Sequence, residues 1–229
     1  MPLCNKTPKK KLLTKKPDRE KASELIEEMS KSEKGKYSSL DEVIDKTRQL
    51  SIFFSGVEYD TYFGWCYDIG VRNFLMSYHY IKGRSLKSLI GQYQGVHLFV
   101  DSGAFTFTSD PKFNDFTVEQ WEEHIKKYLD WAERNKDFIF AIANLDIEYI
   151  VGAETVKRWN QELFEPFMLR TGIPVCFIWH GEECYATWEQ YCQRYPYVGL
   201  TAVNNRDAEA SGASYFKDML KVAEKHDAV

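Results

Sequence analysis

Short apolar runs alternate with amphipathic stretches along most of the chain. The runs are rich in β-branched and aromatic residues, which favours strands. They cover 51–57, 73–77, 96–100, 138–145, 173–179 and 197–203. Most of the stretches between them have apolar residues at helical spacing, which predicts helices. These helices cover 86–93, 118–134, 154–169, 186–194 and 215–225. Continuous apolar strands separated by helices are typical of a parallel sheet that is covered on both faces.

The succession of six strand–helix units favours one architecture. Six units in a row fit a (β/α) barrel better than the usual five- or six-stranded doubly wound sheet. The sequence therefore predicts an α/β fold of TIM-barrel type with about six of the eight units of a complete barrel. The segment 59–70 fits a helix poorly, so the connection after the first strand stays unassigned. An incomplete barrel exposes strand edges, which favours a homo- or hetero-oligomer that completes it.

The first fifty residues differ from the rest. Residues 1–17 are rich in lysine, have no periodicity and are expected to be a disordered basic tail. Residues 18–50 predict an N-terminal helical segment, and 51–229 form the barrel-like domain. The first 16 residues carry six lysines and no acid, so the remaining residues carry a net charge of −10. A basic arm on an acidic body fits either contact with nucleic acid or a solvated tail.

Composition and cysteine use narrow the class of protein. The chain has 229 residues, 44% of them apolar and 15% aromatic, which excludes a disordered chain as a whole. No run of about 18 uncharged apolar residues could span a membrane, and no secretory signal is present. Five cysteines without a CxxC pair favour a reduced, cytoplasmic compartment over a disulfide framework or a cysteine zinc site.

Polar residues follow every predicted strand, and the carboxyl ends of parallel strands are where α/β enzymes bind their substrates. They are Ser55, Gly56 and Glu58, then Ser77, Tyr78 and His79, then Asp101, Ser102 and Gly103, then Asn144, Asp146 and Glu148, then His180 and Gly181, then Asn204 and Asn205. Asp101 and Asp146 stand out because each follows a strongly apolar run. Two carboxylates at one barrel mouth can divide the acid and base roles of a reaction.

Each of these residues also has a structural interpretation. Asp101 lies in Asp-Ser-Gly, which is good turn chemistry, and Asp146 could cap a helix or pair with a cation. His180 fits a structural role as well as a binding role, and His79 fits packing in an aromatic cluster. Asp101, Asp146 and His180 could together hold a metal, but no ligand spacing in the sequence supports this. We therefore expect neither a metal nor a cofactor; the usual glycine-rich phosphate loops are also absent.

Residues 98–105 read LFVDSGAF, which resembles the DSGGF segment of tRNA-guanine transglycosylases and most closely the DSGAF form of their phage and DpdA-like relatives. Three later segments are similar to strands of the same family in the same order. They are 144–152 (NLDIEYIVG), 173–181 (IPVCFIWHG) and 197–203 (YVGLTAV). The similarity extends over roughly residues 51–205. It implies a TIM barrel that exchanges a guanine in tRNA or DNA for a 7-deazaguanine base.

The resemblance also implies roles for individual residues. Asp101 resembles the catalytic acid beside the reacting base, and Ser102 and Gly103 of the same motif would line that base. Phe105 would stack on the base, and Asp146 would accept hydrogen bonds from its N1–H and exocyclic amine. His180 stands where the family has an amide side chain. Gly199 would leave space for the ring.

Two departures from the family leave other functions open. The family's covalent nucleophile is an aspartate on a later strand, and the resemblance implies that this C-terminal part is missing here. Asp207, Asp218 and Asp227 follow, but none comes at a predicted strand end. The cysteine-rich zinc motif is also absent. The alternatives are a non-catalytic barrel subunit that binds base or RNA, and an unrelated TIM-barrel metal-dependent hydrolase or lyase.

Overall fold

The computed structural model describes residues 52–113, 115–180, 185–201 and 213–228. The chain divides into two units, Met1–Ile52 and Phe53–Val229, and nearly all described residues belong to the second. The expected basic tail and N-terminal helical segment lie outside the described residues. Among the helices of the described part, none combines the length and apolar character needed to cross a membrane.

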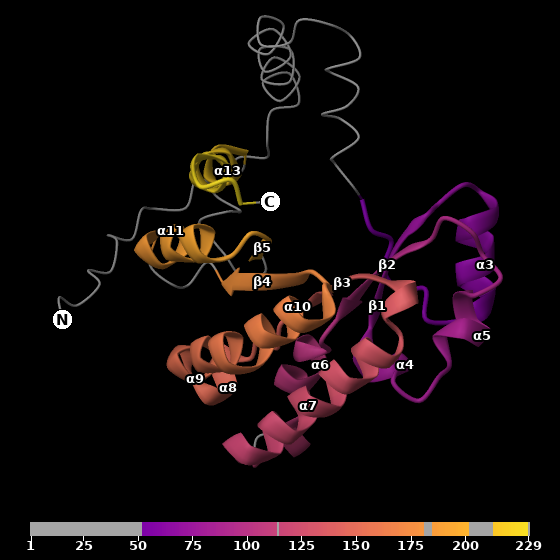
Figure 1. The fold of residues 1–229 in the computed structure, drawn as a ribbon, viewed down its shortest axis with the longest axis horizontal. Helices are drawn as coiled ribbons and strands as arrows, with labels where there is room; N and C mark the ends of the chain where they lie inside the picture. The colour runs from indigo at the N-terminus through magenta and orange to yellow at the C-terminus, as the bar shows by residue number, and fades with distance from the viewer. Residues whose placement is uncertain (1–51, 114, 181–184, 202–212, 229) are drawn as a thin grey trace, which may run out of the picture. The chain divides into compact units, whose positions relative to one another are not determined.

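The described strands form one parallel sheet in sequential order, β1-β2-β3-β4-β5 (Figure 1). They are β1 (Asn73–Ser77), β2 (His97–Asp101), β3 (Ile139–Ala143), β4 (Val175–His180) and β5 (Val198–Thr201). Each coincides with a predicted apolar run, which confirms the parallel α/β class. In the register of β1 and β2, Ser77 lies opposite Asp101, so the two strands end together.

The predicted strand at 51–57 was largely wrong. Only Phe54 pairs with the sheet, through its N–H to the Asn73 carbonyl at 3.0 Å and its carbonyl to the Leu75 N–H at 2.8 Å. Gly56 then takes a φ of 76°, a left-handed conformation that ends the extended segment. The predicted strand is therefore a single bridge at the edge of β1.

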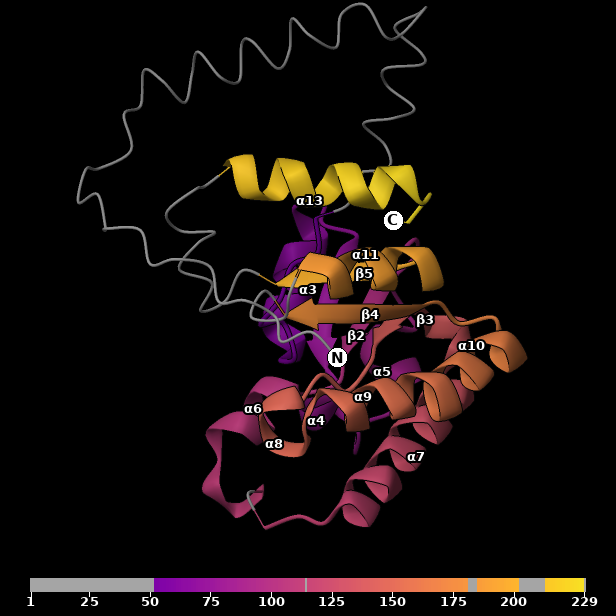
Figure 2. The same ribbon diagram turned by 90° about the vertical axis from the view of Figure 1, so that its left-hand side faces the viewer.

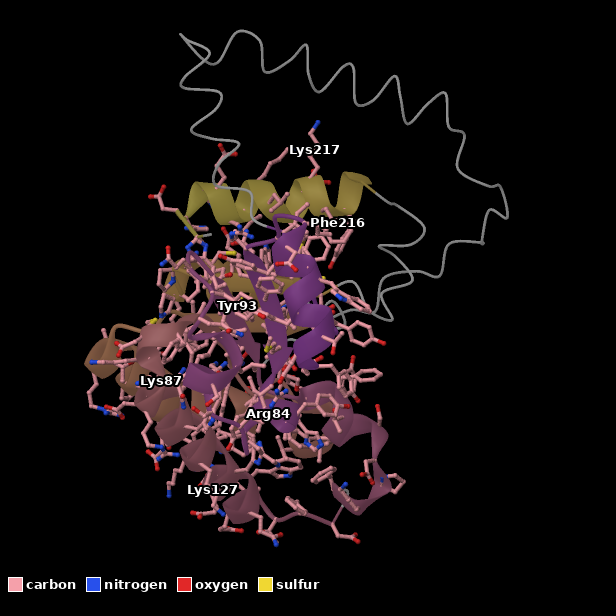
Figure 3. All side chains as sticks on the ribbon, turned by 90° about the vertical axis from the view of Figure 1, so that its right-hand side faces the viewer. Arg84, Lys87, Tyr93, Lys127, Phe216 and Lys217 are labelled. Carbon is pink, nitrogen blue, oxygen red and sulfur yellow. The ribbon has the colours of Figure 1, made fainter. Side chains whose placement is uncertain are left out.

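The segment that fitted a helix poorly nevertheless forms one, α3 (Asp60–Asp68). Of its side chains only Phe63 is fully buried, and its ring centroid lies 4.2 Å from that of Phe74 in β1. Tyr93 packs on the other side of Phe63 at 5.0 Å (Figure 3). One buried aromatic gives almost no periodic signal in the sequence, so tertiary packing decides this helix.

The remaining helices follow the strands. They are α4 (Tyr78–Ile81), α5 (Leu86–Ile90), α6 (Ala104–Ser109), α7 (Val118–Arg134), α8 (Glu148–Val151), α9 (Ala153–Trp159), α10 (Glu165–Thr171), α11 (Tyr185–Arg194) and α13 (Ala213–Lys225), with short 3₁₀ turns at Pro111–Phe113 and Lys136–Phe138. The limits of α7 match the prediction, and a capping box between Thr117 and Gln120 fixes its start.

The single helix predicted over 154–169 is divided by a π-helical turn, Asn160–Phe164, between α9 and α10. Pro166 lies in the first turn of α10. Proline has no N–H to donate and its ring collides with the carbonyl four residues earlier, so the helix widens before it. The widened turn includes Asn160, whose side chain is fully buried.

The two faces of the sheet are covered differently. One face carries the main core, in which every described helix with buried apolar side chains takes part together with Phe74, Leu98 and Phe177. The other face has only a small cluster of Phe99, Ala141, Ala143 and Cys176, bordered by four half-buried side chains, none of them in a helix. The expectation of a sheet covered by helices on both faces is therefore not met by the described helices, which all pack on one face.

Asn144, directly after β3, connects three elements. Its Nδ2 donates to Asn160 Oδ1 in the π turn at 3.0 Å, and its Oδ1 accepts from the Ile178 N–H of β4 at 2.9 Å. Both asparagines are fully buried. Their hydrogen bonds therefore fix the end of β3 relative to β4 and to the helical layer.

We predict that Asn144→Ala lowers the free energy of unfolding by about 1–3 kcal/mol, because it leaves the buried Ile178 N–H and the Asn160 side chain without their partner. Urea unfolding followed by circular dichroism measures this loss. Gln190→Ala, on an exposed position of α11, is the control and should change stability little. Equal effects of the two substitutions would contradict the role given to Asn144.

Candidate functional site

The turn after β2 holds Asp101 in place. Asp101 Oδ2 accepts a hydrogen bond from the Gly103 N–H at 2.9 Å. Gly103 has a φ of 92°, and a Cβ there would lie 2.9 Å from the His79 Cβ and 3.3 Å from Ser77 Oγ. Glycine is therefore required for both conformation and space. The Asp-Ser-Gly segment is a turn, as one interpretation of the sequence held, and it also directs Asp101 to the carboxyl edge of the sheet.

The carboxyl group of Asp101 is partly buried at the end of β2. Burial raises its pKa, and the negative charge of Asp146 raises it further. Hydrogen bonds from Gly103, Ser77 and Ser102 stabilise the ionised form and reduce the shift without cancelling it. Asp101 therefore keeps a proton to higher pH than an aspartate in water does.

Asp146, Glu148 and His180 form a compact cluster at the ends of β3 and β4. His180 Nε2 lies 3.1 Å from Asp146 Oδ2 and 3.5 Å from Glu148 Oε2. The side chains are only 14%, 11% and 18% exposed in the order Asp146, Glu148, His180, so solvent screens these charges weakly. Burial opposes protonation of His180, but the bond to Asp146 and the charges of Glu148 and Asp146 outweigh it and raise its pKa.

Tyr128 of α7 lies buried beneath these strand ends. Its hydroxyl group is 3.0 Å from the Val100 carbonyl and 3.1 Å from the Ala143 carbonyl and donates its one proton between them. Burial, followed by the charges of Asp101 and Asp146, raises the pKa of Tyr128 well above 10, so the phenol stays neutral. It bridges Val100, the residue before Asp101 in β2, and Ala143, the last residue of β3.

The sequence did not single out Tyr128 or commit to Glu148 as a site residue. A signal for Tyr128 was present, because it is a hydroxyl group on the otherwise apolar face of an amphipathic helix, among Trp121, Ile125 and Leu129. Glu148 followed the same strand as Asp146. Only the position of His180 on the neighbouring strand reveals that Glu148 belongs to the cluster.

Phe105 and Gly199 lie at different places in the strand order. Phe105 follows β2, the strand of Asp101, whereas Gly199 is in β5, at the end of the described sheet. Phe105 is the second residue of α6, and 79% of its surface is exposed. Gly199 in β5 lies under Ile178, whose Cδ1 would be 2.4 Å from a Cβ at this position. Glycine therefore allows the Ile178 side chain to lie across β5. Ser102 is fully buried, and Gly181 lies outside the described residues.

The structure brings Asp101, Asp146 and His180 to one edge of the sheet, as the strand-end rule predicts. Figure 2 shows β4 with its arrow pointing to the end of the sheet at which α6 and α8 lie. Among the described residues, no group of three or more histidine, cysteine or acidic side chains is arranged to hold a metal ion. Burial and the charge of Asp146 raise the pKa of Cys176 to about 12, so this thiol is not a nucleophile at neutral pH.

His79 packs among aromatic rings, as one interpretation of the sequence proposed. Its ring centroid lies 5.1 Å from that of Tyr80 and 5.6 Å from that of Phe107. Burial and the charges of Lys82 and Lys112 lower its pKa. The two imidazoles of the acidic edge therefore differ, because the pKa of His180 is raised and that of His79 is lowered. The edge can accept hydrogen bonds at Asp146 and can supply a proton at Asp101.

We predict that Asp101→Asn stabilises the protein at pH 7 by about 0.5–2 kcal/mol, because it removes a partly buried charge that Asp146 repels. The folded-state pKa of Asp101 is raised, so wild-type stability falls as the pH rises through the interval between the unfolded and folded values. The gain should therefore shrink as the pH falls toward 4. Urea unfolding at several pH values measures it. Asp110→Asn should give no gain, and a pH-independent effect of Asp101→Asn would contradict the assignment.

We predict the opposite pH dependence for His180→Gln. The raised pKa of His180 means that its ion pair contributes full stability below about pH 6.5, the unfolded value, and loses it as the pH rises through the folded value. The variant should therefore be destabilised more at pH 6 than at pH 9. Thermal unfolding across this range measures the difference. A constant difference would show that the imidazole is not charged in the fold.

Comparison of the chain with protein-family models, with curated proteins and with solved structures finds no match. These comparisons therefore neither support nor exclude the family that the sequence motifs resemble. What can be concluded about function rests on the chemistry of the strand ends: two carboxyl groups in different surroundings, one of them hydrogen-bonded to a histidine, beside an exposed aromatic ring.

Proposed function

We propose that the carboxyl edge of the sheet binds a guanine-like base, and that the chain is a base-exchange transferase that replaces guanine by a 7-deazaguanine in tRNA or DNA. The observation that carries this proposal is the pair of acids at neighbouring strand ends. Asp146 is hydrogen-bonded to His180, whose pKa is raised, and Asp101 also has a raised pKa. Exposed Phe105 follows Asp101 on the same turn.

Asp146 fits the recognition of a guanine-like base. Such a base presents its N1–H and its exocyclic amine side by side, and a carboxylate has acceptor sites for two donors. Asp146 Oδ2 already accepts from His180, which orients the carboxylate and leaves Oδ1 for the base. His180 then acts as a positioning residue for Asp146. The ring of Tyr149, with its centroid 5.8 Å from that of His180, borders the same place.

Asp101 fits the proton transfers of a base exchange. When the C1′–N9 bond breaks, its electron pair stays on the departing base, and a protonated Asp101 can supply the proton that this base needs. The resulting carboxylate can take the proton of the incoming base as the new bond forms. A carboxyl group with a raised pKa is suited to both steps. Phe105 would hold the ring by stacking.

The proposed function is accompanied by a proposal about the complete fold. We infer that the five described strands are part of the wall of a (β/α) barrel of TIM type with about six units. The sequential strand order and the helices on one face support this, because a doubly wound sheet reverses its strand order and carries helices on both faces. The small Ala141 and Ala143 would then face the barrel interior.

A second function, a base-binding subunit without catalysis, is favoured by the positions of the later aspartates. Exchange through a covalent intermediate needs a carboxylate that attacks C1′. Asp218 lies within α13 and Asp227 follows that helix, so neither follows a described strand. Asp207 lies outside the described residues. Base binding is therefore better supported than exchange, and the two need separate experiments.

We predict that the chain binds guanine and 7-deazaguanine selectively over adenine, and that Asp146→Asn lowers this affinity about 10- to 100-fold. The amide places an N–H against the donors of the base and removes a charge-assisted acceptor. Isothermal titration calorimetry measures the affinity. Asp110→Asn is the matched control, because Asp110 lies beyond the motif and pairs with Lys112. Equal affinity for adenine, or equal losses in both variants, would reject the proposed pocket.

Exchange is tested separately from binding. The chain is incubated with tRNA or DNA and with labelled guanine, and the protein is then denatured. Incorporation of the label, or a nucleic-acid adduct that survives denaturation, supports the transferase. Base binding without either result supports the non-catalytic subunit. Stoichiometric metal in the purified protein without affinity for guanine would favour the unrelated hydrolase or lyase.

A further inference from the structure

Exposed aromatic side chains follow four successive strand positions at the carboxyl edge of the sheet. Tyr59 follows the segment of the Phe54 bridge, Tyr80 follows β1, Phe105 follows β2 and Tyr149 follows β3. Their exposed fractions are 71%, 60%, 79% and 58% in that order. We call these four residues the aromatic rim. Single exposed apolar residues are ordinary, but one in each of four neighbouring connections indicates a binding surface.

Contacts between the strand ends place the rim around the candidate site. Tyr59 follows Glu58, whose Oε1 accepts from the Ser77 N–H at the end of β1 at 3.3 Å. Tyr80 is in edge-on contact with His79, which lies against Gly103. Tyr149 is in edge-on contact with His180 at the end of β4. The rim therefore follows the sheet edge on which Asp101 and Asp146 lie.

The charge of the connection after β1 differs from that of the rest of the domain. Residues 78–96 contain Lys82, Arg84 and Lys87 and no acid, although the chain beyond its first 16 residues carries a net charge of −10. Lys82, two residues after Tyr80, is exposed, and Arg84 pairs with Asp60 at the start of α3. The segment that carries Tyr80 is therefore the part of the rim best suited to a polyanion.

We propose that the aromatic rim binds a single-stranded nucleic acid, with the unpaired bases that flank the target stacked on Tyr59, Tyr80 and Tyr149 and with phosphate groups near Lys82. Every base has a flat face, so aromatic rings bind a strand with little regard to sequence. Strands of a sheet are about 4.8 Å apart, so the three spacings from Tyr59 to Tyr149 extend over about 15 Å, enough for more than one base.

The inference rests on the proposed function, because it takes the target base to lie at Asp146 and Phe105. It adds that the polymer must be unpaired where it meets the protein. In a duplex each base is covered on both faces by its neighbours, so a paired strand has no free face to offer to three separate rings. A protein partner with apolar side chains would use the same rings but would need no phosphate.

The test compares three labelled ligands of equal length by fluorescence anisotropy with the full chain. They are an intact single strand, the corresponding duplex, and an abasic strand that keeps every phosphate. We expect the intact strand to bind at least about ten-fold more tightly than the other two. The triple variant Tyr59→Ala/Tyr80→Ala/Tyr149→Ala should lose at least about ten-fold affinity for the intact strand and little for the abasic strand.

Trp65→Ala is the matched control for the variant. Trp65 is also aromatic and 61% exposed, but it lies within α3 and is separated by Tyr62 from Tyr59, which precedes the helix. Its loss should leave binding of the strand unchanged, and circular dichroism should show all variants folded. The inference is overturned if the abasic strand binds as well as the intact one, if the triple variant binds unchanged, if Trp65→Ala loses as much affinity, or if no strand binds.

Failure of the inference about the aromatic rim can be distinguished from failure of the proposed function. Binding of guanine without preference for the intact strand would reject the rim alone. Binding of the strand through the three tyrosines without affinity for guanine would reject the base pocket and leave the rim in place.

Discussion

The hydrogen bonds that Tyr128 and Asn144 make at the strand ends are the constraint on which the rest of this site depends. Tyr128 bridges the carbonyls of Val100 and Ala143, and Asn144 connects the end of β3 to β4 and to the π turn. Backbone groups at buried strand ends must find partners, and these two side chains supply them. They thereby fix the spacing of the strands from which Asp101, Asp146 and His180 extend.

That spacing has an electrostatic cost. Asp101 and Asp146 repel each other in a partly buried place, and Glu148 adds a third acid. His180 compensates the charge beside Asp146, while Asp101 responds by holding its proton more strongly. The outcome is two carboxyl groups of the same chemical type in different surroundings, which is an arrangement that acid–base chemistry uses. Repulsion between buried charges and a shifted pKa, at one edge of a well-packed sheet, are typical of a functional site.

The carboxyl edge differs from the rest of the molecule in what it exposes. Helices cover one face of the sheet with a continuous apolar core, so the large aromatic side chains there are buried. At the carboxyl edge four aromatic residues stay exposed, and two of them, Phe105 and Tyr149, follow the strands that deliver Asp101 and Asp146. A base pocket and a surface for the flanking bases would therefore share one set of connections, and the position of each is fixed by the end of a strand.

The sequence by itself determined the parts that depend on local pattern. Apolar runs defined β1 to β5, helical periodicity defined α7, and the strand-end rule selected Asp101, Asp146 and His180. Tertiary structure alone decided the rest. The packing of Phe63 on Phe74 makes α3 a helix, and Asp146 and His180 meet although 34 residues separate them. Burial raises the pKa of Asp101. The reason is that burial and contacts between distant residues exist only once the strands have paired, and no local pattern encodes them.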